Sequence, residues 1–347
     1  MLAGRATAEG TARYAARFPR AGEAHFRRTA PGLTLSSIGI GTYLGRDDAA
    51  TDAGYAAAVR RALGLGIGVV DTAINYRNQR SERAVAVAIR ESGTARDEIV
   101  VCTKGGYLPF DGNRPADVRA YVEETFVRPG LLRPEEIVDG CHSLAPRYLE
   151  DQLERSRKNL GLQTIDVYYL HNPETQLGHV SRGEFSARLR AAFEVLEGAC
   201  AEGTIGCYGA ATWNGFRLEG DDEEHLDLPE LAGLAREVGG PDHHFRAVQL
   251  PFNLEMDEAR GLKNQRGDRT LLEAAGDEGV TVFASASVHQ GQLARQLPNG
   301  LRETMPGLRT DAQRALQFVR SQPGVACALV GMKSERHVAE NAELVEV

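Results

Sequence analysis

Short apolar runs alternate with longer amphipathic stretches from residue 37 to the C-terminus of this chain. The runs contain almost no alternating polar residues, which is typical of parallel strands that are covered on both faces. We predict strands at 37–41, 69–71, 99–104, 165–171, 206–210, 247–250, 280–285 and 327–330. Successive strand–helix units favour a (β/α)8 barrel, but their number alone does not distinguish a closed barrel from an open parallel sheet.

The amphipathic stretches predict helices at 55–63, 81–91, 148–160, 184–202, 228–238, 270–278, 311–320 and 335–347. Glycines such as Gly64, Gly161 and Gly203 follow these stretches, as expected where a helix ends in a left-handed residue. The GxGxxG pattern of dinucleotide-binding domains is absent from every predicted strand-to-helix turn. The glycine-rich run 64–68 does not supply it, because this run lies where a helix leads into a strand. A Rossmann domain is therefore disfavoured.

Composition excludes several classes of protein. The formal net charge of −8 argues against a general nucleic-acid binder, which needs a basic surface. No apolar run is long enough for a membrane span. The 5 cysteines form no CxxC pair and are predicted to be reduced thiols that bind no metal. We expect a cytoplasmic protein with neither a nucleic-acid nor a membrane partner, and leave a homo-oligomer open.

Three titratable residues end three consecutive predicted strands: Asp71, Lys104 and His171. A strand-end aspartate alone is often a helix cap, and a single histidine is often a core residue. In a barrel, however, the carboxyl ends of the strands hold the active site, and charged groups gather at such sites. Tyr76 follows Asp71 in the next loop and is close enough in sequence to point back into the barrel mouth. Together these residues predict a reaction centre.

The chemistry of the four side chains predicts proton transfer to a carbonyl oxygen. A buried lysine beside a tyrosine hydroxyl favours the phenolate and lowers the tyrosine pKa, and an aspartate keeps that lysine charged. A histidine within hydrogen-bonding distance orients the carbonyl oxygen. Tyr76 is thus predicted as a general acid that acts while a hydride reaches the carbonyl carbon.

The surrounding motifs resemble those of the aldo-keto reductase superfamily over nearly the whole chain. The matching segments are 35–42, 68–76 with Ser81 and Glu82, the strand end at Thr103 and Lys104, and 160–171. The resemblance implies a (β/α)8 barrel, a catalytic tetrad of Asp71, Tyr76, Lys104 and His171, and NADP(H) bound in an extended form without a Rossmann fold. A long insertion after the third strand marks a divergent subgroup.

By the same resemblance, the cofactor contacts Gly41, Thr42, Asp71, Thr212, Asn214, Gln249, Ser285, Lys333, Ser334, His337, Glu340 and Asn341. For the substrate pocket we predict Tyr43, Tyr107, Phe110, Asn172 and Trp213. Ala211 and Thr212 stand where the family usually has a serine and an asparagine for the nicotinamide carboxamide, and Ser285 replaces a stacking tyrosine. Lys333 and Ser334 begin a helix, where a cation and free N–H groups suit a 2′-phosphate and favour NADPH over NADH.

Two segments lie outside an ordinary barrel of about 250 residues. Residues 1–32 are predicted as an N-terminal arm with a hairpin turn at Pro31-Gly32, and residues 105–147 as an insertion in a single domain spanning 1–347. The insertion leaves from the active-site end of the third strand, and its aromatic residues argue against disorder. We interpret it as a lid or pocket wall, with a subunit contact as the alternative.

The sequence thus predicts a reductase that transfers hydride from NADPH to an aldehyde or ketone, or the reverse reaction on an alcohol. Two alternatives are weighed against it. An aldolase-type lyase would use Lys104 as a Schiff base, but the 333–341 segment and Gln249 have no role in that reaction. An NADPH-binding regulatory subunit, which this superfamily also contains, would show little turnover.

Overall fold

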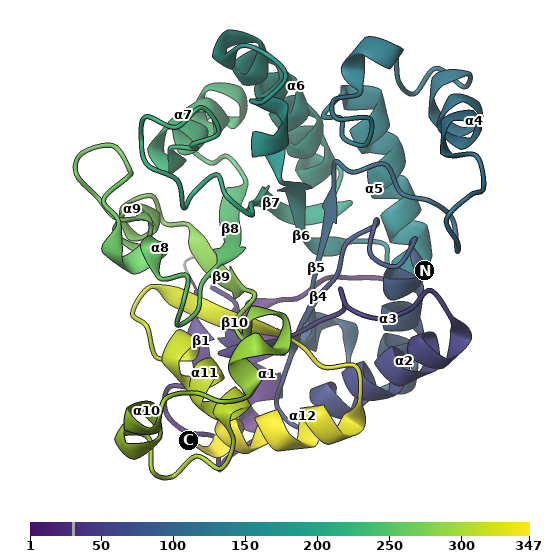
Figure 1. Ribbon diagram of the computed structural model, residues 1–347. Helices are drawn as coiled ribbons and strands as arrows, with labels where there is room; N and C mark the ends of the chain where they lie inside the picture. The colour runs from purple at the N-terminus through teal and green to yellow at the C-terminus, as the bar shows by residue number, and fades with distance from the viewer. Residues whose placement is uncertain (30–31) are drawn as a thin grey trace.

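In the computed structural model, which describes residues 1–29 and 32–347, eight parallel strands form a closed barrel in the order β10-β3-β4-β5-β6-β7-β8-β9 (Figure 1). The (β/α)8 prediction is confirmed, and the open-sheet alternative is wrong. The strands are β3 (Ile38–Gly41), β4 (Val69–Asp71), β5 (Val100–Gly105), β6 (Ile165–His171), β7 (Ile205–Ala211), β8 (Phe245–Pro251), β9 (Thr281–Ser285) and β10 (Val325–Gly331).

Helices surround the barrel, and most begin at a polar cap residue. Ser181, Thr310 and Ser334, for example, each accept a hydrogen bond from the backbone of the first turn. The helices are α2 (Ala49–Leu63), α3 (Arg80–Glu91), α5 (Pro146–Leu160), α6 (Arg182–Ala201), α7 (Leu228–Gly239), α8 (Glu258–Gly261), α9 (Leu271–Asp277), α10 (Asn299–Thr304), α11 (Asp311–Arg320) and α12 (Glu335–Ala342). None in the described part of the chain is long and apolar enough to cross a membrane.

Two predicted helix ends differ from the structure. Gly64 ends α2 with φ −74°, in the right-handed region, so it is not a left-handed cap. The final helix, predicted to reach residue 347, ends at Ala342 and is followed by the 3-10 turn Glu343–Glu346.

Side-chain alternation along the strands places the polar strand ends inside the barrel. Val69 in β4, Val100 and Cys102 in β5, and Val167 and Tyr169 in β6 pack in one apolar cluster in the barrel interior. Residues two positions apart in a strand face the same side. Asp71, Lys104 and His171 each lie two residues beyond a member of this cluster, and so form the next layer at the carboxyl end of the barrel.

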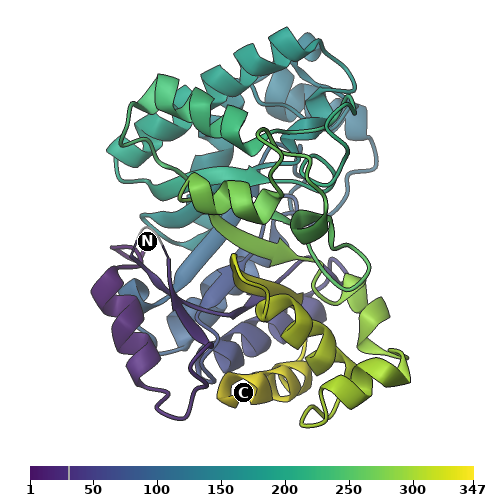
Figure 2. The same cartoon turned by 90° about the vertical axis from the view of Figure 1, so that its left-hand side faces the viewer.

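The N-terminal arm crosses the opposite end of the barrel (Figure 2). It includes α1 (Ala8–Ala16), which sequence reasoning missed, and an antiparallel pair formed by β1 (Phe26–Arg28) and β2 (Thr34–Ser36). The predicted Pro31-Gly32 turn lies partly outside the described residues. Leu35 packs into the interior cluster, so the pair closes the bottom of the barrel.

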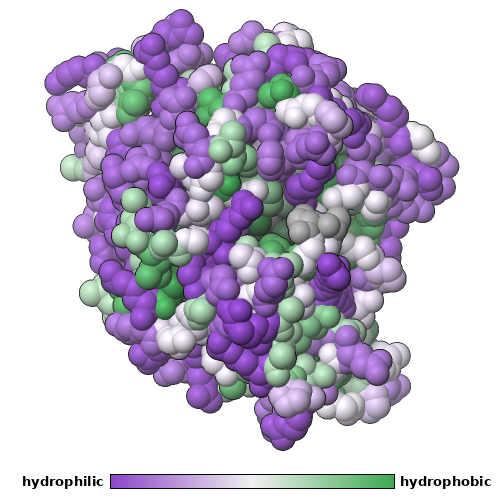
Figure 3. Space-filling view, turned by 180° about the vertical axis from the view of Figure 1, so that it is seen from behind, coloured by the Kyte–Doolittle hydropathy of each residue, from purple (hydrophilic) through white to green (hydrophobic). Residues whose placement is uncertain are grey.

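Seen from behind, the surface of the molecule is mainly hydrophilic with scattered apolar residues (Figure 3).

The 105–147 segment folds beside α5 with a small core of its own. It contains α4 (Val118–Val122), a π-helical turn (Glu123–Val127) and a 3-10 turn (Pro134–Glu136). Leu108, Phe126 and Leu132 pack on Tyr148 of α5. Figure 1 shows this segment at the upper right, beside the barrel mouth rather than across it.

Candidate active site

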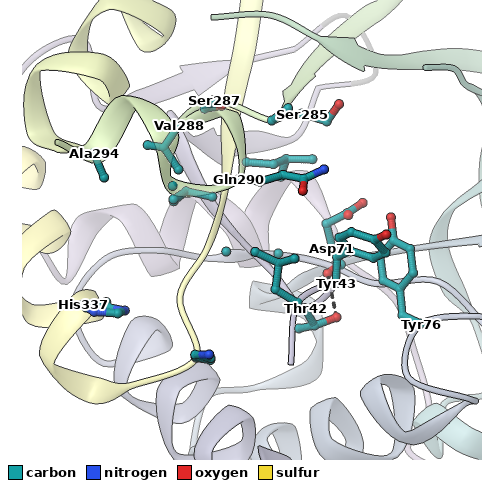
Figure 4. Close-up of a pocket in the computed structure, with 18 of the residues that line it drawn as sticks. Thr42, Tyr43, Asp71, Tyr76, Ser285, Ser287, Val288, Gln290, Ala294 and His337 are labelled. Atoms are coloured by element: carbon teal, nitrogen blue, oxygen red, sulfur yellow. Dashed lines mark hydrogen bonds between the residues drawn. The ribbon is translucent and has the colours of Figure 1, made fainter. Parts of the chain in front are cut away.

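A cavity of about 1140 Å³ opens at the carboxyl ends of the strands. Figure 4 shows Tyr43, Asp71 and Tyr76 on one side of it, with His337 of α12 farther along. Most of the residues predicted for the site line this cavity: Gly41, Thr42, Tyr43, Asp71, Tyr76, Tyr107, His171, Asn172, Thr212, Trp213, Gln249, Ser285, Lys333, His337, Glu340 and Asn341.

Lys104 lies just behind the cavity wall and is 1% exposed. Its Nζ donates to Asp71 Oδ2 at 2.7 Å and to the Thr72 carbonyl at 2.8 Å, and it lies 5.0 Å from the centre of the Tyr76 ring. The Tyr76 and His171 rings meet edge to face with centroids 5.8 Å apart. The structure therefore brings all four predicted side chains together around one corner of the cavity.

The loop that carries Tyr76 is held in an uncommon backbone conformation. Arg77, Asn78 and Gln79 have φ values of 49°, 55° and 69°, in the left-handed region that non-glycine residues seldom adopt. Arg77 is buried and pairs with Asp52 of α2. Such strained turns persist where the surroundings determine them, as they do at many active sites.

Burial and charge act in opposite directions on Tyr76. Burial raises its pKa and the Lys104 ammonium lowers it, and burial prevails, so the pKa is raised overall. The lowered Tyr76 pKa predicted from the neighbouring lysine is therefore wrong, because burial outweighs the effect of Lys104. For Lys104, burial lowers the pKa, but the charge of Asp71 and the hydrogen bond to it outweigh burial and raise the pKa overall. The pair therefore consists of a neutral phenol beside an ammonium ion.

His171 is neutral. Burial, and then the nearby Lys104 and His142, lower its pKa well below the ordinary value. Its Nδ1 is buried without a hydrogen-bond partner among the described residues. A neutral imidazole carries one N–H, so His171 offers one donor and no positive charge.

On the far side of Asp71, Gln249 Nε2 donates to Asp71 Oδ1 at 2.8 Å. Asp71 is thus held between Lys104 and Gln249, a contact that the sequence did not predict. Thr212 lies next to Gln249, whose carbonyl accepts from the Thr212 backbone N–H. The Thr212 hydroxyl is buried and has no partner in the described structure.

The beginning of α12 borders the other end of the cavity. Lys333, Arg336 and His337 line it there, together with Asn341, whose Oδ1 is buried without a partner in the described part of the chain. Ser334 caps the helix instead of lining the cavity, because its hydroxyl accepts from the His337 backbone N–H at 3.4 Å.

Two more predicted residues lie outside the cavity lining. The Asn214 backbone N–H donates to Glu174 and its carbonyl accepts from Arg217, so Asn214 belongs to a tight turn below the rim. Phe110 is drawn into the 105–147 segment, where its ring meets Tyr121 edge to face at 5.5 Å. Asn214 had been placed by resemblance, and Phe110 by the interpretation of the insertion as a pocket wall.

Sequence reasoning missed the loop that follows β9. Ser287, Val288, Gln290 and Ala294 line the cavity opposite Tyr76 (Figure 4). Ala286, His289, Gln290 and Gly291 have φ values between 43° and 95°. Successive backbone N–H groups in such conformations form concave anion sites. Gly291 was the only signal in this stretch, and one glycine does not identify a loop of this kind.

Glu174 was also missed. It is buried just after β6, and its Oε1 accepts from the backbone N–H groups of Trp213, Asn214 and Gly215 at 2.8, 3.0 and 3.3 Å. Burial raises the pKa of this carboxyl. The contacts fix the turn that carries Trp213 at the rim. Glutamate in a loop gives no sequence signal for such a role.

No group of three or more His, Cys, Asp or Glu side chains that could hold a metal ion occurs within residues 1–29 and 32–347. All five cysteines are free.

Comparison with known proteins gives consistent results. The family model described as "Aldo/keto reductase family" matches residues 37–302. A D-threo-aldose 1-dehydrogenase from Pseudomonas sp is 30% identical over 305 residues, which cover 83% of this chain and 82% of the relative. A Schizosaccharomyces pombe relative named after voltage-gated potassium channel beta subunits is 23% identical, over 91% of this chain and 86% of its own length.

A solved structure shares the fold. The aldo/keto reductase from Klebsiella pneumoniae in complex with NADP and acetate superimposes with a TM-score of 0.62 at 22% identity, over 93% of this chain and 90% of that chain.

Proposed function

This chain belongs to the aldo/keto reductase family, and from that premise we propose that it reduces an aldehyde or ketone with hydride from NADPH, with Tyr76 as the general acid. The observation that carries the proposal is the buried Lys104–Asp71 pair beside Tyr76 at the wall of a large cavity. The reverse reaction, oxidation of an alcohol, would use the same groups.

The residues of the cavity fit the proposed cofactor. The unpartnered Thr212 hydroxyl and Asn341 Oδ1 are buried polar atoms that a ligand can satisfy. We assign Thr212 and Gln249 to the nicotinamide end, and Asn341 to the adenine end. Lys333 and Arg336 supply two cations near the start of α12, where a 2′-phosphate would distinguish NADPH from NADH. The loop 286–296 would hold the phosphates between these ends.

NADPH, when bound, supplies the hydride for the carbonyl carbon. Tyr76 donates its hydroxyl proton to the carbonyl oxygen, and Lys104 stabilises the phenolate that remains. Asp71 keeps Lys104 charged. His171, which is neutral, donates one hydrogen bond to the carbonyl oxygen and so orients it. Tyr76 then regains a proton from water in the cavity.

The rim of the cavity suggests a neutral substrate that combines apolar and polar surfaces. Tyr43 and Trp213 are 55% and 39% exposed, and Asn172 donates to the Tyr107 hydroxyl at 3.1 Å below them. Aromatic faces with amide and hydroxyl groups suit an aldose or a hydroxylated ketone. The name of the Pseudomonas relative points to the same class. The five free cysteines support a reducing compartment such as the cytoplasm.

A consumption assay with NADPH and NADH over sugar aldehydes, aromatic aldehydes and ketosteroids tests the proposal. We expect turnover with at least one class, and a preference for NADPH. Stoichiometric NADPH binding without turnover on any carbonyl would instead favour the regulatory subunit. Borohydride trapping of a substrate on Lys104 would favour the lyase.

A further inference from the structure

Both ends of the 105–147 insertion meet at the carboxyl end of β6. Its first residues and its last ones pair across a narrow neck, in which the Leu108 N–H donates to the Cys141 carbonyl at 2.7 Å and the Ser143 N–H donates to the Gly106 carbonyl at 2.9 Å. The neck therefore lies against His171, although the rest of the insertion packs on α5.

His142 of this neck is completely buried and contacts the backbone of His171. His142 Nε2 lies 2.8 Å from the His171 carbonyl oxygen, and His142 Nδ1 lies 2.8 Å from Gln176 Nε2. The Gln176 Oε1 accepts from Arg188 at 2.7 Å, and arginine can only donate. The Gln176 amide N–H must therefore face His142. As a result, Nδ1 of His142 accepts and its Nε2–H donates to His171.

The His171 carbonyl depends on this donor because the sheet ends there. The last β5–β6 pair joins Gly105 and Leu170, so β5 supplies no partner opposite His171. The chain then turns at Asn172, which has φ 46°, and its N–H donates to Ala211 of β7. His142 thus takes the place of a strand partner at the residue that carries the catalytic imidazole.

The neck also contacts the imidazole ring. The Tyr107 ring lies between the rings of His142 and His171, with centroids 4.9 Å and 5.0 Å away and both pairs edge to face. Tyr107 is fixed in turn, because its carbonyl accepts from Tyr148 at 2.9 Å and from Gln152 at 2.7 Å. The insertion therefore touches both the carbonyl and the side chain of His171.

We infer that His142 is a positioning residue for the reduction, and that through it and Tyr107 the insertion forms part of the reaction centre. The inference rests on the proposed function, since it concerns how His171 orients a carbonyl. His142 is not among the residues that line the cavity. It acts by holding the end of β6, and with it His171, in place relative to Tyr76 and Lys104.

The test compares His142→Phe with His25→Phe. His25 is equally buried, has its Nε2 2.8 Å from the Gly66 carbonyl, and lies at the opposite end of the barrel. We expect His142→Phe to lower kcat at least 10-fold, with KM and the NADPH Kd within about 2-fold of wild type, and to increase the deuterium isotope effect with NADPH labelled at the transferred position. His25→Phe should leave all these values unchanged.

Rescue and an activity-independent measurement complete the test. His142→Gln places an amide N–H near the Nε2 position and should restore kcat to within about 3-fold. Hydrogen exchange without cofactor should speed up in peptides covering 165–177 for His142→Phe but not for His25→Phe. If His142→Phe does not fold, the Gln176→Leu variant is tested in its place. This substitution removes the amide that donates to His142 Nδ1 and so fixes the proton on His142 Nε2.

The test separates a failure of the inference about His142 from a failure of the proposed function. A folded His142→Phe or Gln176→Leu with wild-type kcat and exchange would overturn the inference and leave the reductase proposal intact. A wild-type protein that turns over no carbonyl would overturn the proposed function, while the exchange comparison would still report on His142.

Discussion

At the scale of single residues, the important property of Tyr76 is that it keeps its proton. Burial raises its pKa more than Lys104 lowers it. A reductase needs a protonated acid in the ground state and a stabilised phenolate afterwards. In the proposed reaction, the same lysine would supply the second requirement without removing the first, because its effect grows as negative charge develops on the phenolic oxygen.

Lys104→Met should separate these two effects. Without the ammonium, the phenolate is less stable and we expect kcat to fall about 100-fold, within the range of general acid catalysis. Because Lys104 lowers the pKa of Tyr76, its loss should move the alkaline decline in reduction rate to higher pH. Measuring kcat against pH tests both expectations. Lys263→Met is the control, since Lys263 is exposed and pairs with Asp268, outside the cavity lining. An unshifted profile with wild-type kcat would contradict the assignment.

How well the sequence predicted each site residue depends on the element that carries it. Asp71, Lys104 and His171 follow from strand ends, because a parallel barrel brings these ends to one rim. Asn214 and Phe110 lie in loops, where one or two residues of turn geometry decide whether a side chain reaches the cavity. The Gln249–Asp71 contact was not predictable, because it joins strands that are far apart in the sequence.

At the scale of elements, the insertion neck depends on a glycine. Gly106 has φ 139°, and a Cβ there would lie 2.7 Å from His142 Nε2 and 3.1 Å from the His171 carbonyl oxygen. No other residue leaves room for the contact between His142 and His171. The neck is thus the part of the insertion that contacts the end of β6, through His142 and the His171 carbonyl.

Gly106→Ala should therefore impair catalysis more than the same substitution at another glycine of the insertion that has a positive φ. We expect kcat to fall about 10-fold or more with NADPH affinity unchanged, since a misplaced catalytic group is costly. Gly140→Ala is the control, because Gly140 has φ 63° but no atom within 4 Å of the added Cβ. Steady-state kinetics and a binding titration distinguish the variants. Equal activity in both would contradict the role of the neck.

Strands and helices with a strong hydrophobic pattern were predicted from the sequence. Segments whose conformation depends on contacts with distant parts of the chain were not. All eight barrel strands were found to within two residues of their observed bounds at each end. Helix α1 was missed because its stability comes from docking: Arg13 pairs with Asp97 and Glu98, which lie far along the chain. The loop after β9 was missed because irregular backbone has no period.

At the scale of the whole molecule, buried neutral histidines make stability depend on pH. Burial lowers the pKa of His25 to about 4 and that of His142 to about 4, against 6.5 for an unperturbed side chain. Between these values the unfolded chain binds more protons than the folded one. The free energy of unfolding therefore falls as pH decreases from about 6.5 to about 4.

His25→Phe should reduce this dependence. Between pH 7 and pH 5, each such histidine lowers the free energy of unfolding by about 2 kcal/mol relative to a residue that does not titrate. We expect the wild-type protein to lose about 2 kcal/mol more than His25→Phe over this interval. Urea unfolding at both pH values measures the difference. Equal losses in the two proteins would show that His25 titrates normally in the folded state.

The whole-molecule proposal, a carbonyl reductase that uses Tyr76 as its acid, is decided by one comparison. Tyr76→Phe removes a single oxygen atom from a residue at the cavity wall. Turnover of the best carbonyl substrate and NADPH affinity are measured for this variant and for wild type. We expect kcat to fall about 1000-fold or more while the NADPH Kd stays within about 2-fold. A variant that retains reductase activity within 10-fold of wild type would contradict the proposal.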